Sequence, residues 1–474
     1  MPVQTNVLSL EPELVEQHVI SVALDPSSWA IPHQSPLPAT EQVLTVTLLT
    51  YGATITHLTC PDKNGHIQDL VLGFDDWQEY IRQAKGLNPH YGATIGRTAS
   101  RIAHAEFQLD GKTFPLRVSN GKDCLHGGPW GFDKRYWTTH RIDHSRNAVQ
   151  LRLVDPADAN GYPGTLETLV EFRVTDQGDI EIEYEAKLVP DPNCHHDKDD
   201  ATAAAAVATI VSLTNHTYWN LNGVLNNNTT AATSPISKSS KGDNKEATTL
   251  VEGSIRDHTL WLASNTLIRL GSDHPVPTGE ILHLPANLQH LPPCLDLAAN
   301  PDQGTLLGPG IDNIPGGYGY DHVYLLDTPL GATAAAVAAT SISASSLKTI
   351  GIQAHYPHTP HVATLRAPAT TGLALRLLTS EPALVVYAAG YLDAAQQPST
   401  KSTTTTTSSS SSTPTMDAGV TATRRAAQGP FSGLCLEPIR IPDAIHHEDW
   451  APMAILRQGQ TYRQKSVFQL RLLT

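Results

Sequence analysis

The sequence predicts an all-β fold, a large antiparallel sandwich or barrel, on three observations. Apolar and polar residues alternate over short runs, which is the pattern of strands with one buried face. Glycine (33 residues) and proline (34 residues) interrupt the chain often, as turns between strands require. Short strands and turn signals dominate over long amphipathic patterns, and this combination is typical of sandwiches and barrels.

The alternating runs define the expected strands in chain order. Residues 149–154 form the first, and 169–174 and 180–188 follow. The last two flank the turn-forming residues 175–179, so they predict a β-hairpin with one face in water. Further strands are expected at 364–366, 373–378 and 384–387.

Four segments lack any apolar period and are interpreted as insertions. Residues 396–428 contain a Ser/Thr tract, which favours a disordered surface loop. Three others, at about 191–207, 224–249 and 331–346, are rich in alanine or in Asn, Thr, Ser and Lys. Long loops cost little closure entropy. We therefore expect residues 1–474 to form a single sandwich domain that the insertions interrupt without dividing.

Charge and cysteine content limit the class of function. The net charge of −14 and the pI of about 5.8 argue against nucleic-acid and anionic-membrane partners, which favour basic surfaces. A neutral small molecule fits better. There is no apolar run of 18 residues and no secretory leader, and the five cysteines are odd in number and widely spaced. These features predict a soluble cytoplasmic protein. A monomer and a homodimer both remain open.

Two segments carry polar residues among small ones. Arg97 and Arg101 lie four apart in the run 92–102, and an arginine in such a setting can fork onto sugar hydroxyls. For Arg97 the favoured alternative is an ion pair with a carboxylate. His126 precedes Gly127-Gly128, where backbone can approach a ligand closely, although a lone His-Gly-Gly is weak support for a site.

Three further positions suggest sugar contact or proton transfer. Asp321 lies beside Tyr318 and Tyr320, and carboxylates next to aromatic rings suit carbohydrate, although Asp321 could equally form a turn. His216 and Glu437 could form an acid/base pair that moves protons near neutral pH. No group of His and Cys has the spacing of a structural zinc site, so no metal is expected.

Together these segments resemble the aldose 1-epimerase (galactose mutarotase) family. The resemblance covers nearly the whole chain outside the insertions, in the family's order, and the low-complexity insertions favour a fungal-type member. It implies a large antiparallel β-sandwich with a sugar site on one concave face. The matching blocks are 51–55, 61–65, 71–75, 96–102, 125–134, 213–223, 320–322, 378–393, 433–444 and 459–462.

The resemblance also implies roles for individual residues. It makes His216 the general acid and Glu437 the general base in the opening and closing of the sugar ring, with no cofactor. The implied sugar-binding residues are Arg101, His126, Tyr218, Asp321 and, in place of the usual Asn, Ser100.

Three departures from the family pattern leave alternatives open. Ser100 is shorter than the usual Asn, Ile439 follows Pro438 where Glu-Thr-Gln is usual after Cys-Leu, and Val385 replaces a common Gln. The acid and base remain while the polar shell is thinner. We expect an epimerase acting on free hexoses such as glucose and galactose. The alternatives are a non-catalytic sugar-binding or regulatory protein, and an epimerase of a modified or phosphorylated hexose, which would need a cationic cluster.

Overall fold

The computed structural model describes most of the chain outside the expected insertions. Those insertions lie outside the described residues except at Val224 and Gln428, so the predictions about them stay predictions. The described residues are 3–9, 13–25, 29, 42–83, 89–190, 208–224, 253–272, 275–284, 291–328, 359–392 and 428–473.

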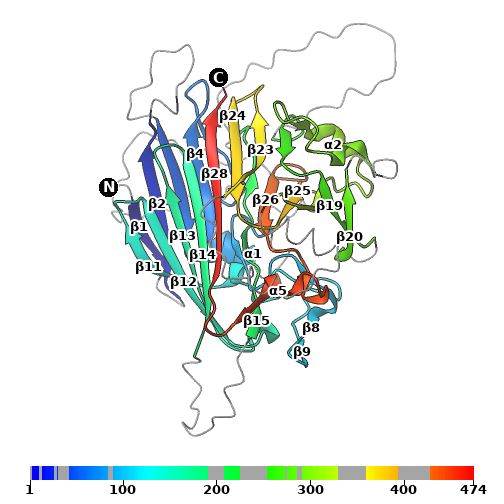
Figure 1. Cartoon of the computed structure of the whole chain (residues 1–474). Coiled ribbons are helices and arrows are strands. Elements are labelled where there is room, and N and C mark those ends of the chain that lie inside the picture. The colour runs from blue at the N-terminus through cyan, green and yellow to red at the C-terminus, as the bar shows by residue number, and fades with distance from the viewer. Residues whose placement is uncertain are drawn as a thin grey trace, which may run out of the picture.

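The described residues form three large antiparallel sheets and several shorter elements. The largest has nine strands, and its long strands run side by side in Figure 1. In spatial order they are β11 (Thr138–Asp143), β12 (Ala148–Asp155), β13 (Thr165–Val174), β14 (Asp179–Val189), β28 (Tyr462–Leu472), β24 (Leu373–Thr379), β23 (His361–Ala367), β18 (Thr259–Leu262) and β21 (Thr305–Leu306).

The other two large sheets have five and six strands. The first is built in chain order from β1 (Val3–Ser9), β2 (Val15–Ala23), β3 (Val43–Leu49), β4 (Thr54–Pro61) and β5 (Ile67–Asp69). The second has the spatial order β17 (Tyr218–Trp219), β26 (Leu434–Ile439), β25 (Ala383–Tyr387), β22 (Asp321–Leu325), β19 (Thr266–Leu270) and β20 (Pro277–His283).

Short elements complete the fold. Four two-stranded ladders pair β6 (Thr94–Ile95) with β16 (Thr214–Asn215), β7 (Arg101–Ile102) with β10 (Cys124–Leu125), β8 (Glu106–Leu109) with β9 (Lys112–Pro115), and β15 (Ala208–Ile210) with β27 (Ile455–Arg457). The helices are α1 (Trp77–Gln83), α2 (Leu307–Asn313) and α5 (Ala451–Ala454), with 3₁₀ turns η1 (Ala103–Ala105), η2 (Phe132–Lys134), η3 (Ala159–Gly161), η4 (Pro293–Leu295) and η6 (Ala444–His446). Within the described part of the chain, no helix is long and apolar enough to cross a membrane.

The predicted hairpin and strands are present. β13 and β14 pair from Thr165↔Val189 to Val174↔Ile180, and Gly178 closes the turn between them with a φ of 81°. The other expected strands correspond to β12, β23, β24 and β25. Each observed strand extends beyond the expected range by one to three residues at one or both ends. The all-β prediction is confirmed.

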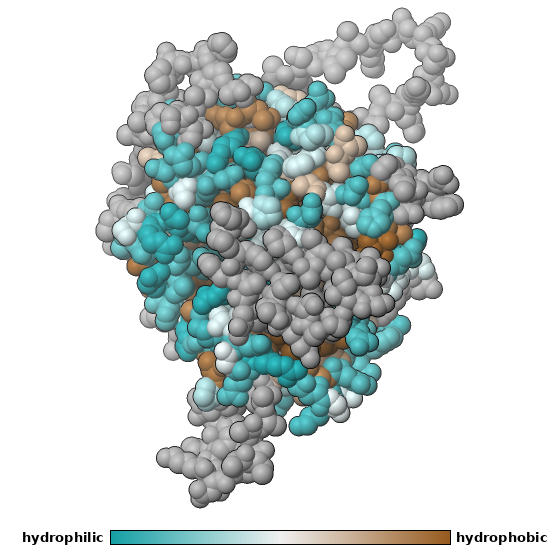
Figure 2. Space-filling model, in the orientation of Figure 1, coloured by the Kyte–Doolittle hydropathy of each residue, from teal (hydrophilic) through white to brown (hydrophobic). Residues whose placement is uncertain are grey.

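One apolar core joins the three large sheets. Its fully buried members include Val46 from β3, Phe172 from β13 and Leu436 from β26. The outer face of the nine-stranded sheet carries charged side chains such as Glu171, Glu183 and Arg463. The coloured part of the surface in Figure 2 is mostly hydrophilic with separate hydrophobic patches. The alternation in the sequence thus separates a wet face from a buried one.

Every residue of strands β25 and β26 is buried, so neither strand has a solvent-exposed face. Leu384 and Val386 point into the main core, whereas Val385 and Tyr387 belong to a second apolar cluster on the other side. The same alternation places Cys435 and Ile439 of β26 in that second cluster. The sheet therefore presents a second, sheltered face.

Candidate active site

The sheltered face of the six-stranded sheet aligns chemically active residues from four strands. In the ladder, Asp321 of β22 lies opposite Tyr387 of β25, which lies opposite Cys435 of β26, which lies opposite Tyr218 of β17. Directly opposite residues share a face of a sheet. Glu437, two residues beyond Cys435, is on this face too.

His216 reaches the same place from a short segment between β16 and β17. Its backbone N–H donates to the carbonyl of Ala93 (2.9 Å), and its carbonyl accepts from the N–H of Gly92 (3.0 Å). These two bonds fix the chain on both sides of the imidazole. His216 and Glu437, far apart in sequence, are thereby brought together.

The two side chains form a buried pair. Nε2 of His216 lies 3.6 Å from Oε1 of Glu437, and each residue is less than 5% exposed. The other ring nitrogen, Nδ1, lies 3.5 Å from the Sγ of Cys435. Because the two nitrogens have different neighbours, Nε2 is the one that can exchange a proton with the carboxyl group.

Burial keeps both members of the pair uncharged in the empty site. It lowers the pKa of His216 to about 3, with repulsion from His90 as the next cause. It raises the pKa of Glu437 well above 4.5, and the nearby Asp321 carboxylate raises it further. Both shifts favour the neutral imidazole of His216 and the protonated carboxyl group of Glu437.

Asp321 lies at the more exposed edge of the row. It begins strand β22 and does not form a turn. Burial raises its pKa, while the charge of Arg101 lowers it. Arg101 is therefore close enough to act electrostatically on Asp321.

Ser100, Arg101 and His126 form one unit at the β7–β10 ladder, called the arch here, and the His126 ring lies 5.3 Å from that of His216. Arg101 pairs with Leu125 in the β7–β10 ladder, and the N–H of His126 donates to the carbonyl of Ser100 (2.9 Å). Nδ1 of His126 in turn accepts from the N–H of Ser100 (3.2 Å). The buried Nε of Arg101 has no hydrogen-bond partner among the described residues, so it retains a donor for a ligand.

Arg97 has the structural role that the sequence favoured. It is buried and donates from Nε (3.1 Å) and Nη2 (2.7 Å) to the Asp155 carboxylate. It also donates to the carbonyls of Pro163 and Gly164. Its guanidinium is thus fully engaged within the fold.

Gly127 approaches protein backbone and not a ligand. It has a φ of 80°, and a Cβ built on it would lie 2.0 Å from the carbonyl oxygen of Gly96. Gly127 therefore holds the segment of His126 against that of Gly96, and Gly128 lies against the Asn160 side chain.

Substituting Gly127 with alanine should displace His126. The added methyl group clashes with backbone and the residue would be strained at positive φ, so the arch must shift. We expect the kcat/KM for a substrate that His126 contacts to fall by about 10²-fold. Gly121→Ala is the matched control, because Gly121 also has a positive φ (60°) but a Cβ there would meet nothing within 4 Å. Steady-state kinetics of both variants separate the effect of the clash from that of backbone strain. Equal effects of the two substitutions would contradict the assignment.

The sequence interpretation missed a third histidine. The ring of His90 lies 4.8 Å from that of His126 and 5.6 Å from that of His216, centroid to centroid. Its Nδ1 is 2.8 Å from the Asp133 carboxylate, which Lys134 also contacts (2.8 Å). His90 directly precedes the Tyr91-Gly92-Ala93 segment that anchors His216, and this adjacency was the available signal.

Tyr218 and Val385 lie beside the His216–Glu437 pair. The hydroxyl of Tyr218 is held by a hydrogen bond, and the side chain of Val385 is apolar. The Tyr218 hydroxyl donates to the carbonyl of Pro89 (2.8 Å), and its ring lies 5.0 Å from that of His216. Its oxygen can still accept a hydrogen bond from a ligand. Val385 is directly opposite Glu437 in the ladder and offers no donor to the carboxyl group.

Three donor groups in the site could hold a metal ion. Ligand atoms of His216, Cys435 and Glu437 all lie within 4.8 Å of one another, and all three residues are buried. However, burial raises the pKa of the Cys435 thiol well above 9, and a thiol binds metal as its thiolate. The donor set therefore suits a metal poorly at neutral pH.

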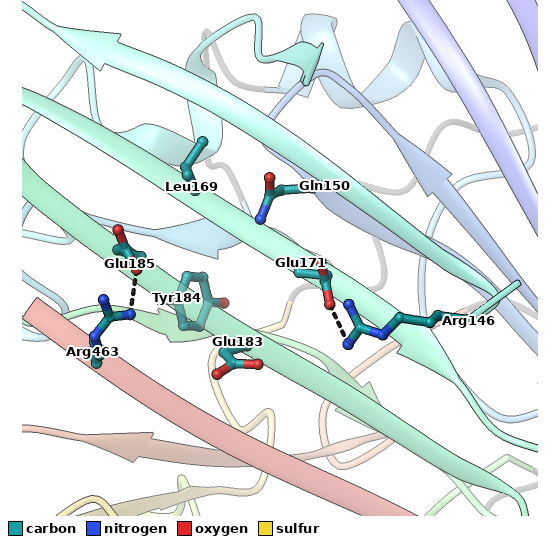
Figure 3. A pocket seen from close by; sticks show the side chains of 8 residues that line it. All are labelled: Arg146, Gln150, Leu169, Glu171, Glu183, Tyr184, Glu185 and Arg463. Atoms are coloured by element: carbon teal, nitrogen blue, oxygen red, sulfur yellow. Dashed lines mark hydrogen bonds and ion pairs between the residues drawn. The ribbon is translucent and has the colours of Figure 1, made fainter. Parts of the chain in front are cut away.

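A shallow pocket of about 200 Å³ lies elsewhere, on the outer face of the nine-stranded sheet (Figure 3). Arg463 pairs there with Glu185, and Arg146 with Glu171 (2.9 Å). None of the predicted site residues lines it. Because its arginines are already neutralised, the pocket offers no free cation to a ligand.

Known proteins have a similar fold and a related sequence. A crystal structure of an aldose epimerase homologue from C. elegans superposes with a TM-score of 0.61 at 22% identity, covering 91% of this chain and 96% of its own. The model of the aldose 1-epimerase family matches residues 39–192 and 198–469.

This chain belongs to the aldose 1-epimerase family. The predicted family, its mutarotase-like sandwich and the prediction of an isomerase are thereby confirmed. Among relatives, the galactose mutarotase of Bos taurus is 27% identical over 90% of this chain and 91% of its own length. The bifunctional protein gal10 of Schizosaccharomyces pombe is 28% identical over 90% of this chain and 44% of its own length.

Proposed function

We propose that this aldose 1-epimerase interconverts the α and β anomers of free hexoses, with His216 and Glu437 as the acid/base pair. The observation that carries the proposal is the buried contact of 3.6 Å between Nε2 and Oε1. Arg101, His126 and Asp321, which are only partly buried, lie at the edge of this pair, where sugar hydroxyls would be bound. The family supports glucose- or galactose-type substrates.

The proposed reaction consists of balanced proton transfers. The Glu437 carboxylate removes the proton of the anomeric hydroxyl, the bond from C1 to O5 breaks, and O5 takes a proton from His216. The resulting aldehyde rotates about the bond between C1 and C2. The O5 hydroxyl then attacks the other face of C1, returning its proton to His216, while Glu437 returns a proton to O1.

The resting proton must first move from Glu437 to His216. In the empty site burial favours the uncharged pair, as the two pKa shifts indicate. Sugar hydroxyls that donate hydrogen bonds to the carboxylate would favour its charged form. Substrate binding would therefore help to create the imidazolium and carboxylate that the reaction uses.

As the pH is lowered, kcat/KM should stay unchanged until the pH is well below 6.5, the ordinary pKa of histidine. The active pair holds one proton, and His216 accepts a second only near its lowered pKa of about 3. His90→Phe should move this acid limb to higher pH, because repulsion from His90 helps to lower the pKa of His216. Polarimetric rates at several pH values test this, and an acid limb near pH 6.5 in the wild type would contradict it.

Raising the pH should remove the remaining proton from the pair and lower kcat/KM. This limb follows the raised pKa of Glu437 and lies well above pH 4.5. Val385→Gln would place an amide donor opposite the carboxyl group, favour its ionised form and shift the alkaline limb to lower pH. Val323→Gln, on the same face but opposite Val385, is the matched control. An alkaline limb that Val385→Gln leaves in place would count against Glu437 as the titrating group.

Polarimetry of freshly dissolved α-D-glucose and α-D-galactose tests the proposal itself. Faster relaxation of optical rotation than in buffer is expected for both sugars. No acceleration of either would favour a sugar-binding protein, and a binding titration would then distinguish it from a protein acting on another substrate. For a phosphorylated hexose, the nearby Lys134 is already engaged with Asp133, so no observation favours that alternative.

A further inference from the structure

A continuous path of buried hydrogen bonds joins the two segments that carry the proposed acid and base. The N–H of Leu213 donates to the hydroxyl oxygen of Tyr462 (3.2 Å), and that hydroxyl donates to Oε1 of Gln464 (2.5 Å). Nε2 of Gln464 in turn donates to the carbonyl of Pro438 (3.0 Å). We call this path from Leu213 to Pro438 the buried bridge.

The buried bridge ends close to both reacting side chains along the chain. Only the two residues of β16 separate Leu213 from His216, and Pro438 directly follows Glu437. Such short lengths of extended backbone leave little slack. A shift at either end of the bridge therefore moves the imidazole or the carboxyl group.

Pro438 makes the bond from Gln464 more important than an ordinary side-chain contact. Pro438 lies opposite Leu384 in the ladder of β25 and β26. A proline has no N–H, so the carbonyl is the only backbone polar group through which this residue can be anchored. That carbonyl accepts the hydrogen bond of the bridge, directly beside Glu437.

Tyr462 is held in place across its ring face. The guanidinium of Arg440 lies 5.1 Å from the ring centroid, and its Nη1 pairs with the Glu381 carboxylate at 3.1 Å. Arg440 directly follows β26, and Glu381 lies two residues before β25, so the ion pair closes this end of the ladder. These three side chains and Gln464 are each at most 3% exposed.

We propose that Tyr462 and Gln464 are positioning residues, which set the separation of His216 and Glu437 without touching the substrate. The contact between Nε2 and Oε1 is 3.6 Å, and a misplacement of about 1 Å in an active site can cost about 10²-fold in rate. Supporting hydrogen bonds keep reacting groups within such a tolerance. The inference rests on the proposed function, because it takes this pair as the acid and the base.

Tyr462→Phe tests the buried bridge, because it keeps the ring beside Arg440 and removes only the hydroxyl group. We expect kcat for α-D-galactose to fall about tenfold, as a displacement smaller than 1 Å would cause, with KM within about twofold of the wild type. Gln464→Met removes the bond to Pro438 while keeping the length of the side chain, and it should have the same effect. An unchanged kcat in both variants would overturn the proposal.

Tyr324→Phe is the matched control for the loss of a buried hydroxyl group. Tyr324 is fully buried, and its hydroxyl donates to a backbone carbonyl, that of Leu295 (3.0 Å). Its removal should lower the urea midpoint of unfolding as much as Tyr462→Phe does, but kcat should stay at the wild-type value. Equal losses of kcat in the two variants would assign Tyr462 a structural role only and overturn the proposal.

Combining Tyr462→Phe with Glu437→Gln separates positioning from a general loss of structure. If the bridge acts through the acid/base pair, adding Tyr462→Phe to Glu437→Gln should lower kcat by less than about twofold, because coupled effects do not add. The same tenfold loss in both backgrounds would overturn the proposal.

Crystal structures decide the inference if the wild type accelerates no sugar and the proposed function fails. The separation of Nε2 of His216 from Oε1 of Glu437 should change by more than about 0.5 Å in Tyr462→Phe, the tolerance of a positioned site, and stay at its wild-type value in Tyr324→Phe. An unchanged separation in Tyr462→Phe would overturn the positioning role whatever the activity of the protein.

Discussion

Replacing Glu437 with glutamine is expected to lower kcat/KM for α-D-galactose by about 10²- to 10⁴-fold, the range that a general acid or base contributes. The amide has nearly the same volume as the carboxyl group but cannot carry the proton, so the buried site should keep its shape. His216→Ala should have an effect of the same order. Polarimetric initial rates measure both.

The double variant provides a sharper test than either single one. If the two residues work as one proton-sharing unit, Glu437→Gln combined with His216→Ala should be little slower than the slower single variant. Glu183→Gln, on the outer face of β14, is a matched control without expected effect. A Glu437→Gln protein that retains more than a tenth of the wild-type kcat/KM would exclude Glu437 as the base.

Replacing Arg97 with methionine is expected to destabilise the protein by about 3–5 kcal/mol, the effect of removing one member of a buried ion pair. The change leaves the Asp155 carboxylate with Arg135 alone and removes the donors to the carbonyls of Pro163 and Gly164. Methionine fills the space of the stem without restoring any hydrogen bond. Urea unfolding followed by fluorescence measures the free energy of unfolding.

An exposed ion pair supplies the control for Arg97. Arg457 pairs with Asp110 at 2.8 Å, but both side chains are at least 41% exposed, so Arg457→Met should cost less than about 1 kcal/mol. Folded Arg97→Met protein should retain its kcat. A small stability loss combined with weaker sugar binding would assign Arg97 to the ligand after all.

Strands were predicted correctly where apolar and polar residues alternate, because such strands have one buried face and one solvent-exposed face. The hairpin of β13 and β14 has this pattern, and its turn and register follow from residues 165–189 alone. In β25 and β26 both faces are buried, and the pattern Leu384-Val385-Val386 does not distinguish the main core from the active-site face. Only packing against two different clusters separates them.

The site residues were predicted as separate segments that resemble a family. Their proximity could not be derived from the sequence, because His216 and Glu437 are 221 residues apart and are joined through the ladder of β17 and β26. His90 was missed because it becomes a neighbour of His126 and His216 only when the Gly92 segment folds against both. A local sequence pattern does not contain such contacts.

The sequence by itself determined the all-β class and the family, and its resemblance to that family predicts the acid and the base, because alternation, turn residues and short motifs are local properties of the chain. The tertiary structure decided which residues share a sheltered face, and hence the directions in which their pKa values shift. Burial disfavours charge, and burial is a property of the assembled sheets. The lowered pKa of His216 and the raised pKa of Glu437 arise only when β22, β25 and β26 enclose the pair.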